Sequence, residues 1–146
     1  MTQIAVFGAG SWGTAFASIL AAGDNDVRVW GRRQGLVDQL NAGVNDDYLP
    51  GVQLPGGISA STDPAEVTEG AEIVILSVPS QSLRTNLTEW APLLTDKIVV
   101  SLMKGIELGT TRVLHIWAAH DVGKAVNGST VTLNGVTTQV TVDDTV

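Results

Sequence analysis

Three glycines near the start of the chain have the spacing of a dinucleotide-binding loop. Gly8, Gly10 and Gly13 form the pattern GxGxxG directly after the apolar residues 4–7. Each glycine has a mechanical role in such a loop. Gly8 permits a tight turn, Gly10 lets the backbone approach a pyrophosphate, and Gly13 lets the next helix lie close to the strand.

The residues after this loop have helical spacing, with an apolar stripe formed by Trp12, Phe16, Ile19 and Leu20. The N–H groups of the first turn, near Ser11 and Trp12, have no partner within a helix and carry partial positive charge, which suits a diphosphate. Strand, loop and helix together therefore favour nucleotide binding over an ordinary glycine-rich turn.

The end of the second predicted strand, Asp26–Trp30, bears on which dinucleotide binds. An NAD site places an acidic residue about 20 residues past the glycine pattern, where it binds the ribose 2′-hydroxyl. This chain has Gly31, Arg32 and Arg33 there, and two guanidinium groups offer forked donors to a 2′-phosphate. We therefore expect NADP to bind at least as well as NAD. The alternative is that both arginines are solvated at the start of a helix.

Length and composition predict one buried core and exclude several classes of site. The chain has 146 residues, of which 44% are hydrophobic, and a net charge of -7. No basic stripe is available for a phosphate backbone, so nucleic acid is not an expected partner. Without cysteine there is no disulfide and no thiolate nucleophile or metal ligand. Assembly into a homo-oligomer is left open.

Neither a metal site nor a membrane span is expected. His115 and His120 are separated by five positions without an acidic residue between them, which favours solvated or core histidines over a metal pair. Residues 4–22 are apolar enough to resemble a signal peptide, but no basic region precedes them and glycines interrupt them. A buried strand and helix explain them better, and we expect a cytoplasmic protein.

Strands and helices alternate along the chain, which predicts an α/β fold with a doubly wound parallel sheet of the Rossmann type. The expected strands are residues 4–7, Asp26–Trp30, 58–60, Ile73–Leu76 and 98–102. The expected helices follow the glycine loop, cover Gln34–Asn41, begin at Pro64 and cover 80–94. For the third helix, Asp63 is the expected N-cap, Glu66 closes a capping box and Gly70 is the stop.

The C-terminal residues predict a β-hairpin. Residues 129–133 and 136–142 are rich in valine and threonine, and Asn134-Gly135 between them is a hairpin turn. Because an isolated hairpin is marginally stable, we expect it to dock on the open edge of the sheet. The chain therefore divides into a dinucleotide-binding domain, residues 1–117, and a hairpin tail, residues 118–146.

Five motifs follow one another in the chain: Gly8-Ala9-Gly10-Ser11-Trp12-Gly13-Thr14-Ala15, Val29-Trp30-Gly31-Arg32, Tyr48-Leu49-Pro50-Gly51, Ser77-Val78-Pro79-Ser80 and Ser101-Leu102-Met103-Lys104-Gly105-Ile106-Glu107. In this order they resemble the bacterial NAD(P)-dependent glycerol-3-phosphate dehydrogenases, from about Thr2 to about Leu114. The resemblance implies reversible hydride transfer between NAD(P)H and dihydroxyacetone phosphate, which gives sn-glycerol 3-phosphate for phospholipid synthesis.

The glycine pattern and the resemblance together give the expected cofactor-binding residues: Gly8, Gly10, Ser11, Trp12, Gly13, Arg32, Arg33, Tyr48, Pro79 and Lys104. The resemblance places Ser11 and Trp12 at the diphosphate and Pro79 along the nicotinamide. It also implies that Lys104 touches the substrate, where an ammonium could polarise a carbonyl or bind phosphate. The residues alone favour a surface lysine before a helix at Lys104.

Beyond about Ala118 the chain shares no motif with this family, whose members continue into a helical domain. The resemblance assigns to that domain the lysine that acts as general acid or base and an Arg-Asn pair that holds the substrate phosphate. No catalytic residue is therefore expected in this chain, and a truncated or frameshifted product or an added tail fits the pattern. A stand-alone NAD(P)-binding module without turnover is the alternative function. A different two-domain dehydrogenase is a weaker one.

Overall fold

The computed structural model describes residues 1–109, 113–114, 117–120, 130–133 and 136–139. Its strands are β1 (Gln3–Phe7), β2 (Asp26–Trp30), β3 (Ile58–Ser61), β4 (Ile73–Leu76), β5 (Ile98–Ser101), β6 (Gly105–Ile106), β7 (Val113–Leu114), β8 (Trp117–His120), β9 (Thr130–Leu133) and β10 (Val136–Gln139). Its helices are α1 (Ser11–Ala21), α2 (Gln34–Asn41), α3 (Pro64–Thr68) and α4 (Leu83–Trp90), with 3-10 turns η1 (Ser80–Ser82) and η2 (Ala91–Leu94).

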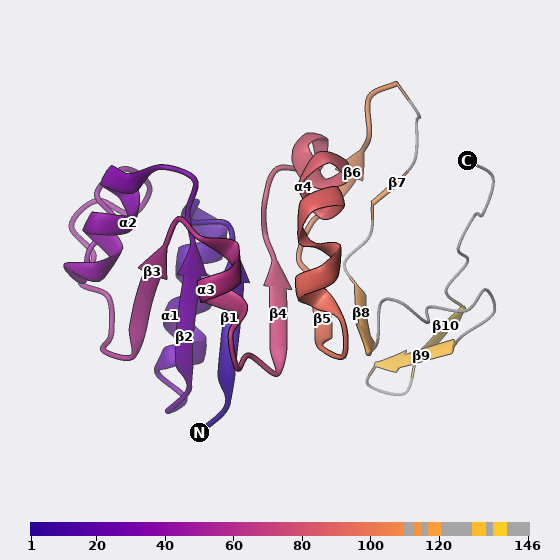
Figure 1. The fold of residues 1–146 in the computed structure, drawn as a ribbon, viewed down its shortest axis with the longest axis horizontal. Coiled ribbons are helices and arrows are strands. Elements are labelled where there is room, and N and C mark those ends of the chain that lie inside the picture. The colour runs from indigo at the N-terminus through magenta and orange to yellow at the C-terminus, as the bar shows by residue number, and fades with distance from the viewer. Residues whose placement is uncertain (110–112, 115–116, 121–129, 134–135, 140–146) are drawn as a thin grey trace.

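The main sheet has the strand order β3-β2-β1-β4-β5-β8, from left to right in Figure 1. Strands β1 to β5 are parallel, which confirms the predicted Rossmann-type fold, and β8 pairs antiparallel with β5. The strand order reverses direction between β1 and β4. In sheets of this kind a ligand crevice lies at that reversal, beyond the carboxyl ends of the strands.

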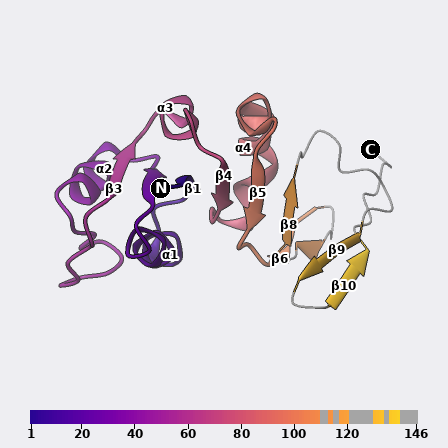
Figure 2. The ribbon, with the colours of Figure 1, turned by 90° about the horizontal axis from the view of Figure 1, so that it is seen from below.

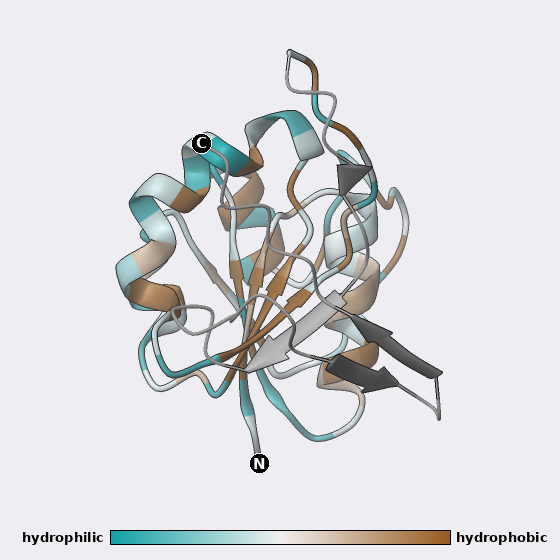
Figure 3. Ribbon diagram, turned by 90° about the vertical axis from the view of Figure 1, so that its right-hand side faces the viewer, coloured by the Kyte–Doolittle hydropathy of each residue, from teal (hydrophilic) through white to brown (hydrophobic). Residues whose placement is uncertain are grey.

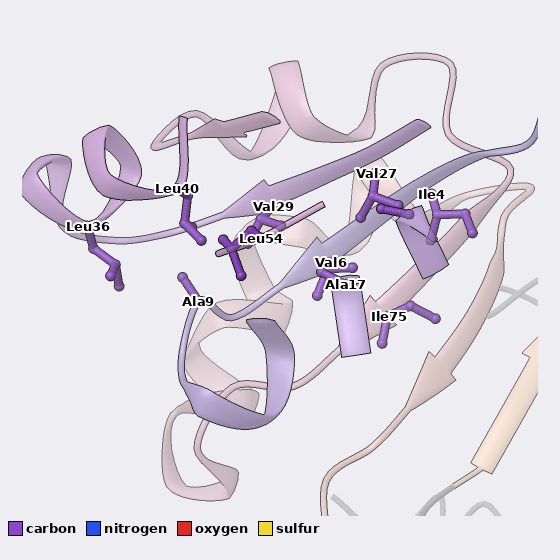
Figure 4. Packing of buried hydrophobic residues seen from close by; sticks show 11 residues of the cluster. Ile4, Val6, Ala9, Ala17, Val27, Val29, Leu36, Leu40, Leu54 and Ile75 are labelled. Carbon is purple, nitrogen blue, oxygen red and sulfur yellow. The ribbon is translucent and has the colours of Figure 1, made fainter. Parts of the chain in front are cut away.

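Helices cover both faces of the sheet (Figures 1 and 2). On one face, Ala17 of α1 and Leu40 of α2 share a buried cluster with Val6 and Ile75 of the sheet (Figure 4). On the other face, the ring of Trp90 from α4 lies 4.4 Å from that of Phe7 and 5.0 Å from that of Trp30, centroid to centroid. Figure 3 shows the same division by hydropathy, with apolar strands inside and polar stretches along the helices.

The start of α3 differs in one respect from its prediction. Asp63 is the N-cap, and its Oδ1 accepts a hydrogen bond of 2.8 Å from the Ala65 N–H. Glu66 does not close a capping box, because its Oε2 accepts from the Ser61 hydroxyl at 2.6 Å. That hydroxyl oxygen also accepts the Asp63 N–H at 3.1 Å, so Ser61 occupies the place predicted for Glu66.

The single helix predicted over residues 80–94 is three pieces: η1, α4 and η2. Pro92 lies in η2 and has no N–H for an α-helical hydrogen bond, which accounts for the end of α4 at Trp90. No helix in the described part of the chain is both long and apolar enough to cross a membrane.

The C-terminal strands β9 and β10 pair antiparallel as a separate two-stranded sheet, with Val136 opposite Leu133. The Asn134-Gly135 turn lies outside the described residues, so the complete hairpin stays a prediction. The expectation that it docks on the open sheet edge is wrong, because β8 pairs with β5 at that edge.

Candidate active site

The glycine loop turns sharply between β1 and α1. Gly8 has φ of +125°, a conformation that side-chain-bearing residues rarely adopt, and its N–H donates to the Trp30 carbonyl at 3.1 Å. A Cβ at Gly13 would lie 1.9 Å from the Gly8 carbonyl oxygen and 2.5 Å from Ser77 Oγ. The first turn of α1 therefore lies so close to the end of β1 that there is no room for a side chain at Gly13.

Gly10, in contrast, faces open space. A Cβ built on Gly10 meets no heavy atom within 4 Å, and its φ of -74° is accessible to any residue. Gly10 is also the N-cap of α1, and no side chain caps that end of the helix. The first-turn N–H groups that follow, on Ser11 and Trp12, can therefore bind an anion that comes close to Gly10.

Two side chains that the sequence does not mark as supports, Asn45 and Ser77, hold this loop in place. The buried Asn45 donates through Nδ2 to the Ala9 carbonyl at 3.1 Å and to Thr14 Oγ1 at 2.8 Å. From the other side, the Ser77 hydroxyl is 3.2 Å from both the Phe7 and Gly8 carbonyl oxygens. Asn45 lies in a long polar loop without periodicity, so its burial has no signal in the sequence.

A pocket of about 490 Å³ opens at the reversal of strand order. Its lining comes from the start of α1 and from the segments that follow β4 and β5: Trp12, Ser77, Val78, Pro79, Ser80, Leu102, Met103 and Lys104. Three of the predicted site residues, Trp12, Pro79 and Lys104, are therefore brought together across about 90 positions of sequence. Of the described residues that line the pocket, Lys104 is the only ionisable one.

The segment after Lys104 is fixed to η1 and to the start of α4. Gln81 donates through Nε2 to the Ile106 carbonyl and accepts the Leu108 N–H through Oε1, both at 2.9 Å. Arg84 makes a two-pronged pair with Glu107, at 2.9 Å from Nε and 2.8 Å from Nη2. The Glu107 carboxylate raises the pKa of Arg84 above its usual value. These contacts restrain the backbone that carries Lys104.

A second group of predicted residues gathers where β2 ends. Arg33 donates through Nη2 to Asp47 Oδ2 at 2.7 Å, and its Cζ lies 6.0 Å from the centre of the Tyr48 ring. Arg32 is exposed and makes no side-chain hydrogen bond or ion pair with any described residue. The pocket lining does not include Arg32, Arg33 or Tyr48. The end of β2 nevertheless lies against the glycine loop, because a Cβ built on Gly31 would lie 3.3 Å from Ala9 Cβ.

The two histidines give no described site. His115 lies outside the described residues, and only the backbone of His120, in β8, is described. Within the described part of the chain, no three histidine, cysteine, aspartate or glutamate residues are grouped so that they could hold a metal ion.

Comparison with known proteins points to one enzyme family. The model of the NAD-dependent glycerol-3-phosphate dehydrogenase N-terminus matches residues 3–142. A glycerol-3-phosphate dehydrogenase (NAD(P)+) of Streptomyces avermitilis is 56% identical over 110 residues, which cover 74% of this chain and 33% of that protein. The corresponding protein of Corynebacterium aurimucosum is 50% identical over 116 residues, 78% of this chain and 35% of that protein.

Solved structures agree with this result. The glycerol-3-phosphate dehydrogenase of Coxiella burnetii superposes with a TM-score of 0.68 at 36% identity, over 73% of this chain and 34% of that one. That of Plasmodium falciparum gives 0.69 at 28% identity, over 77% and 35%. The chain thus spans about a third of the length of the relatives that it matches. The family model extends past residue 118, and the division at residues 117 and 118 stays a prediction.

Proposed function

The chain belongs to the NAD-dependent glycerol-3-phosphate dehydrogenase family, as its N-terminal part, and we propose that it forms the cofactor site of such an enzyme. The proposed reaction is reversible hydride transfer between NAD(P)H and dihydroxyacetone phosphate, which gives sn-glycerol 3-phosphate for phospholipid synthesis. The observation that carries this proposal is the pocket between Trp12, Pro79 and Lys104, which opens beside the uncapped start of α1.

In this proposal the cofactor diphosphate lies over Gly10, where there is no side chain to obstruct it. The N–H groups of Ser11 and Trp12 donate to its oxygens, while Gly8 and Gly13 give the loop its shape. Val78, Pro79 and Met103 make the wall of the pocket largely apolar, which suits the flat face of a nicotinamide ring.

Lys104 is the proposed contact to both nicotinamide and substrate. It lies just past β5, at the carboxyl edge of the sheet, with its ammonium free to approach a ligand in the pocket. A positive charge there stabilises the negative charge that develops on the carbonyl oxygen of dihydroxyacetone phosphate as hydride arrives, or holds the substrate phosphate. The restraint of residues 106–108 by Gln81 and Arg84 keeps this ammonium near the pocket.

The adenosine end of the cofactor is proposed to lie at the end of β2, near Tyr48. Arg32 and Arg33 would bind the ribose there, and a 2′-phosphate more strongly, so NADP is the favoured cofactor. A cytoplasmic location belongs to the same proposal, because residues 4–22 form β1 and α1 as expected for a buried strand and helix. Homo-oligomerisation stays a prediction, which light scattering can test.

Substitution at Gly10 tests the cofactor site. In Gly10→Ala the added methyl meets no protein atom, so the fold should be unchanged, but it projects into the space proposed for the diphosphate. We expect the dissociation constants of NADPH and NADH, measured by calorimetry, to rise together by about tenfold or more.

Gly35→Ala is the matched control, because a Cβ there also meets no atom and Gly35 lies on the exposed side of α2. It should bind both cofactors as the parent chain does. If Gly10→Ala keeps the parent affinity for both, the diphosphate does not lie over this glycine and the proposed site is wrong.

A further inference from the structure

The acidic residue Asp47 forms an ion pair with Arg33, an arginine that the proposed function assigns to the cofactor. Arg33 is the N-cap of α2 in an extended conformation, with φ of -103° and ψ of 124°, so its side chain leaves the chain just past the end of β2. Its guanidinium pairs with Asp47 at 2.7 Å between Nη2 and Oδ2. The Arg33 side chain is 55% exposed, so the pair lies at the surface where an incoming ribose would approach it.

The Asp47 carboxylate is held on both oxygens. While Oδ2 accepts from Arg33, Oδ1 accepts from Gln39 Nε2 at 2.9 Å. Gln39 is fixed in turn, because its Oε1 accepts the Asp46 N–H at 2.9 Å. These donors lower the pKa of Asp47, Gln39 first and Arg33 second, so the carboxylate is charged at neutral pH. The guanidinium is thus set between a fixed anion and the Tyr48 ring.

This arrangement should affect the binding of NAD and of NADP differently. A ribose 2′-hydroxyl is neutral and is little affected by a nearby carboxylate. A 2′-phosphate is an anion that must share Arg33 with Asp47 and is repelled by its charge. Arg32, which has no such partner among the described residues, is unaffected.

We propose that Asp47 is a selectivity residue of the cofactor site, which limits the preference for NADP by holding Arg33. The inference rests on the proposed function and adds to it an acidic residue that affects the choice between NAD and NADP. It accounts for a site with two arginines at the end of β2 in which one guanidinium is already neutralised.

The variant Asp47→Asn tests this directly. It keeps the size of the side chain and one acceptor for Gln39 but removes the charge that holds Arg33. Dissociation constants of NADPH and NADH are measured by calorimetry on the full chain at low and at physiological salt. We expect NADPH to bind about 3- to 5-fold more tightly and NADH to change by less than about 2-fold, as is typical of exposed charge pairs. The gain should shrink as salt rises.

Two controls separate the loss of the Arg33–Asp47 ion pair from the loss of a negative charge in this region. Asp46→Asn removes the same charge from the neighbouring residue, whose carboxylate accepts from the Gly51 N–H and not from Arg33. It should have a smaller effect on NADPH. The second control repeats Asp47→Asn in an Arg33→Ala background, where the gain for NADPH should be lost because its proposed route is gone.

Three results would overturn the inference without contradicting the proposed function. Equal gains for both cofactors would show a change in the whole site, and the same NADPH gain without Arg33 would show simple charge repulsion. Weaker NADPH binding in Asp47→Asn would show that the carboxylate orients Arg33 toward the phosphate. If the parent chain binds neither dinucleotide, the proposed function fails and the inference fails with it.

Discussion

Neighbouring glycines in the loop after β1 differ in what surrounds them. Gly13 is enclosed by the Gly8 carbonyl and Ser77, whereas Gly10 faces open space. The sequence pattern predicts close packing of the helix at Gly13 and the approach of a pyrophosphate at Gly10. In the structure Gly13 has no room for a side chain, whereas a ligand role for Gly10 stays a prediction.

The two arginines after β2 allow a prediction about the affinity for each cofactor. In Arg32→Ala combined with Arg33→Ala, NADPH should lose affinity by about tenfold or more, because charged hydrogen bonds to its 2′-phosphate are removed. NADH, which lacks the 2′-phosphate, should lose less. Competition titrations of both cofactors check this, and equal losses would place the arginines away from the 2′-position.

Side chains that support the loop could not be predicted in the same way. Asn45 and Asp47 belong to a stretch of polar, glycine- and proline-rich sequence that predicts only a loop. Asn45 is buried and Asp47 is paired because tertiary folding brings residues 43–57 beside the glycine loop and α2. A periodic pattern carries no information about such contacts.

At the scale of elements, the loop between α2 and β3 is tied to the loop between β1 and α1 through Asn45. Removing that side chain in Asn45→Ala deprives the Ala9 carbonyl and Thr14 Oγ1 of a buried donor. We expect the free energy of unfolding to fall by about 1 to 3 kcal/mol. Urea denaturation measures this loss.

Cofactor affinity should weaken in the same variant, because the Ala9 carbonyl belongs to the glycine loop, where the diphosphate is proposed to bind. Asn41→Ala is the control. Asn41 also bonds to backbone, at Ala60, but it is exposed and makes no contact with the glycine loop. If both variants bind NADPH alike, Asn45 stabilises the fold without shaping the site.

The elements themselves were largely predictable. The alternation of strands and helices predicts where β1 to β5 lie in the chain and that they are parallel, because buried parallel strands and amphipathic helices have distinct apolar patterns. The errors fall where local signals compete. Ser61 takes the capping contact expected of Glu66, and Pro92 interrupts a helix whose apolar spacing continues through it.

At the scale of the whole molecule, we expect this chain to bind cofactor without turnover. Hydride transfer to a ketone leaves an oxyanion that needs a proton donor as well as a positive charge, and among the described residues that line the pocket Lys104 alone is ionisable. The relatives are about three times as long. Purified chain saturated with NADPH should therefore show no continuing loss of absorbance when dihydroxyacetone phosphate is added.

The outcome of that assay also decides between an enzyme part and a stand-alone binding module. Restored turnover on addition of the remaining two thirds of a relative would favour the enzyme part. Repeated turnover by the chain alone would show that a proton donor lies among residues outside the pocket lining.

The position of Trp12 beside the pocket makes its fluorescence useful. Its indole is 60% exposed and borders the pocket, while Trp90 is buried and Trp30 packs against it. Indole emits light at wavelengths that reduced nicotinamide absorbs, so a bound NADPH would accept excitation energy from this side chain. The site therefore contains its own optical probe. Comparison of emission from the parent chain and from Trp12→Phe would separate the signal of Trp12 from that of the other tryptophans.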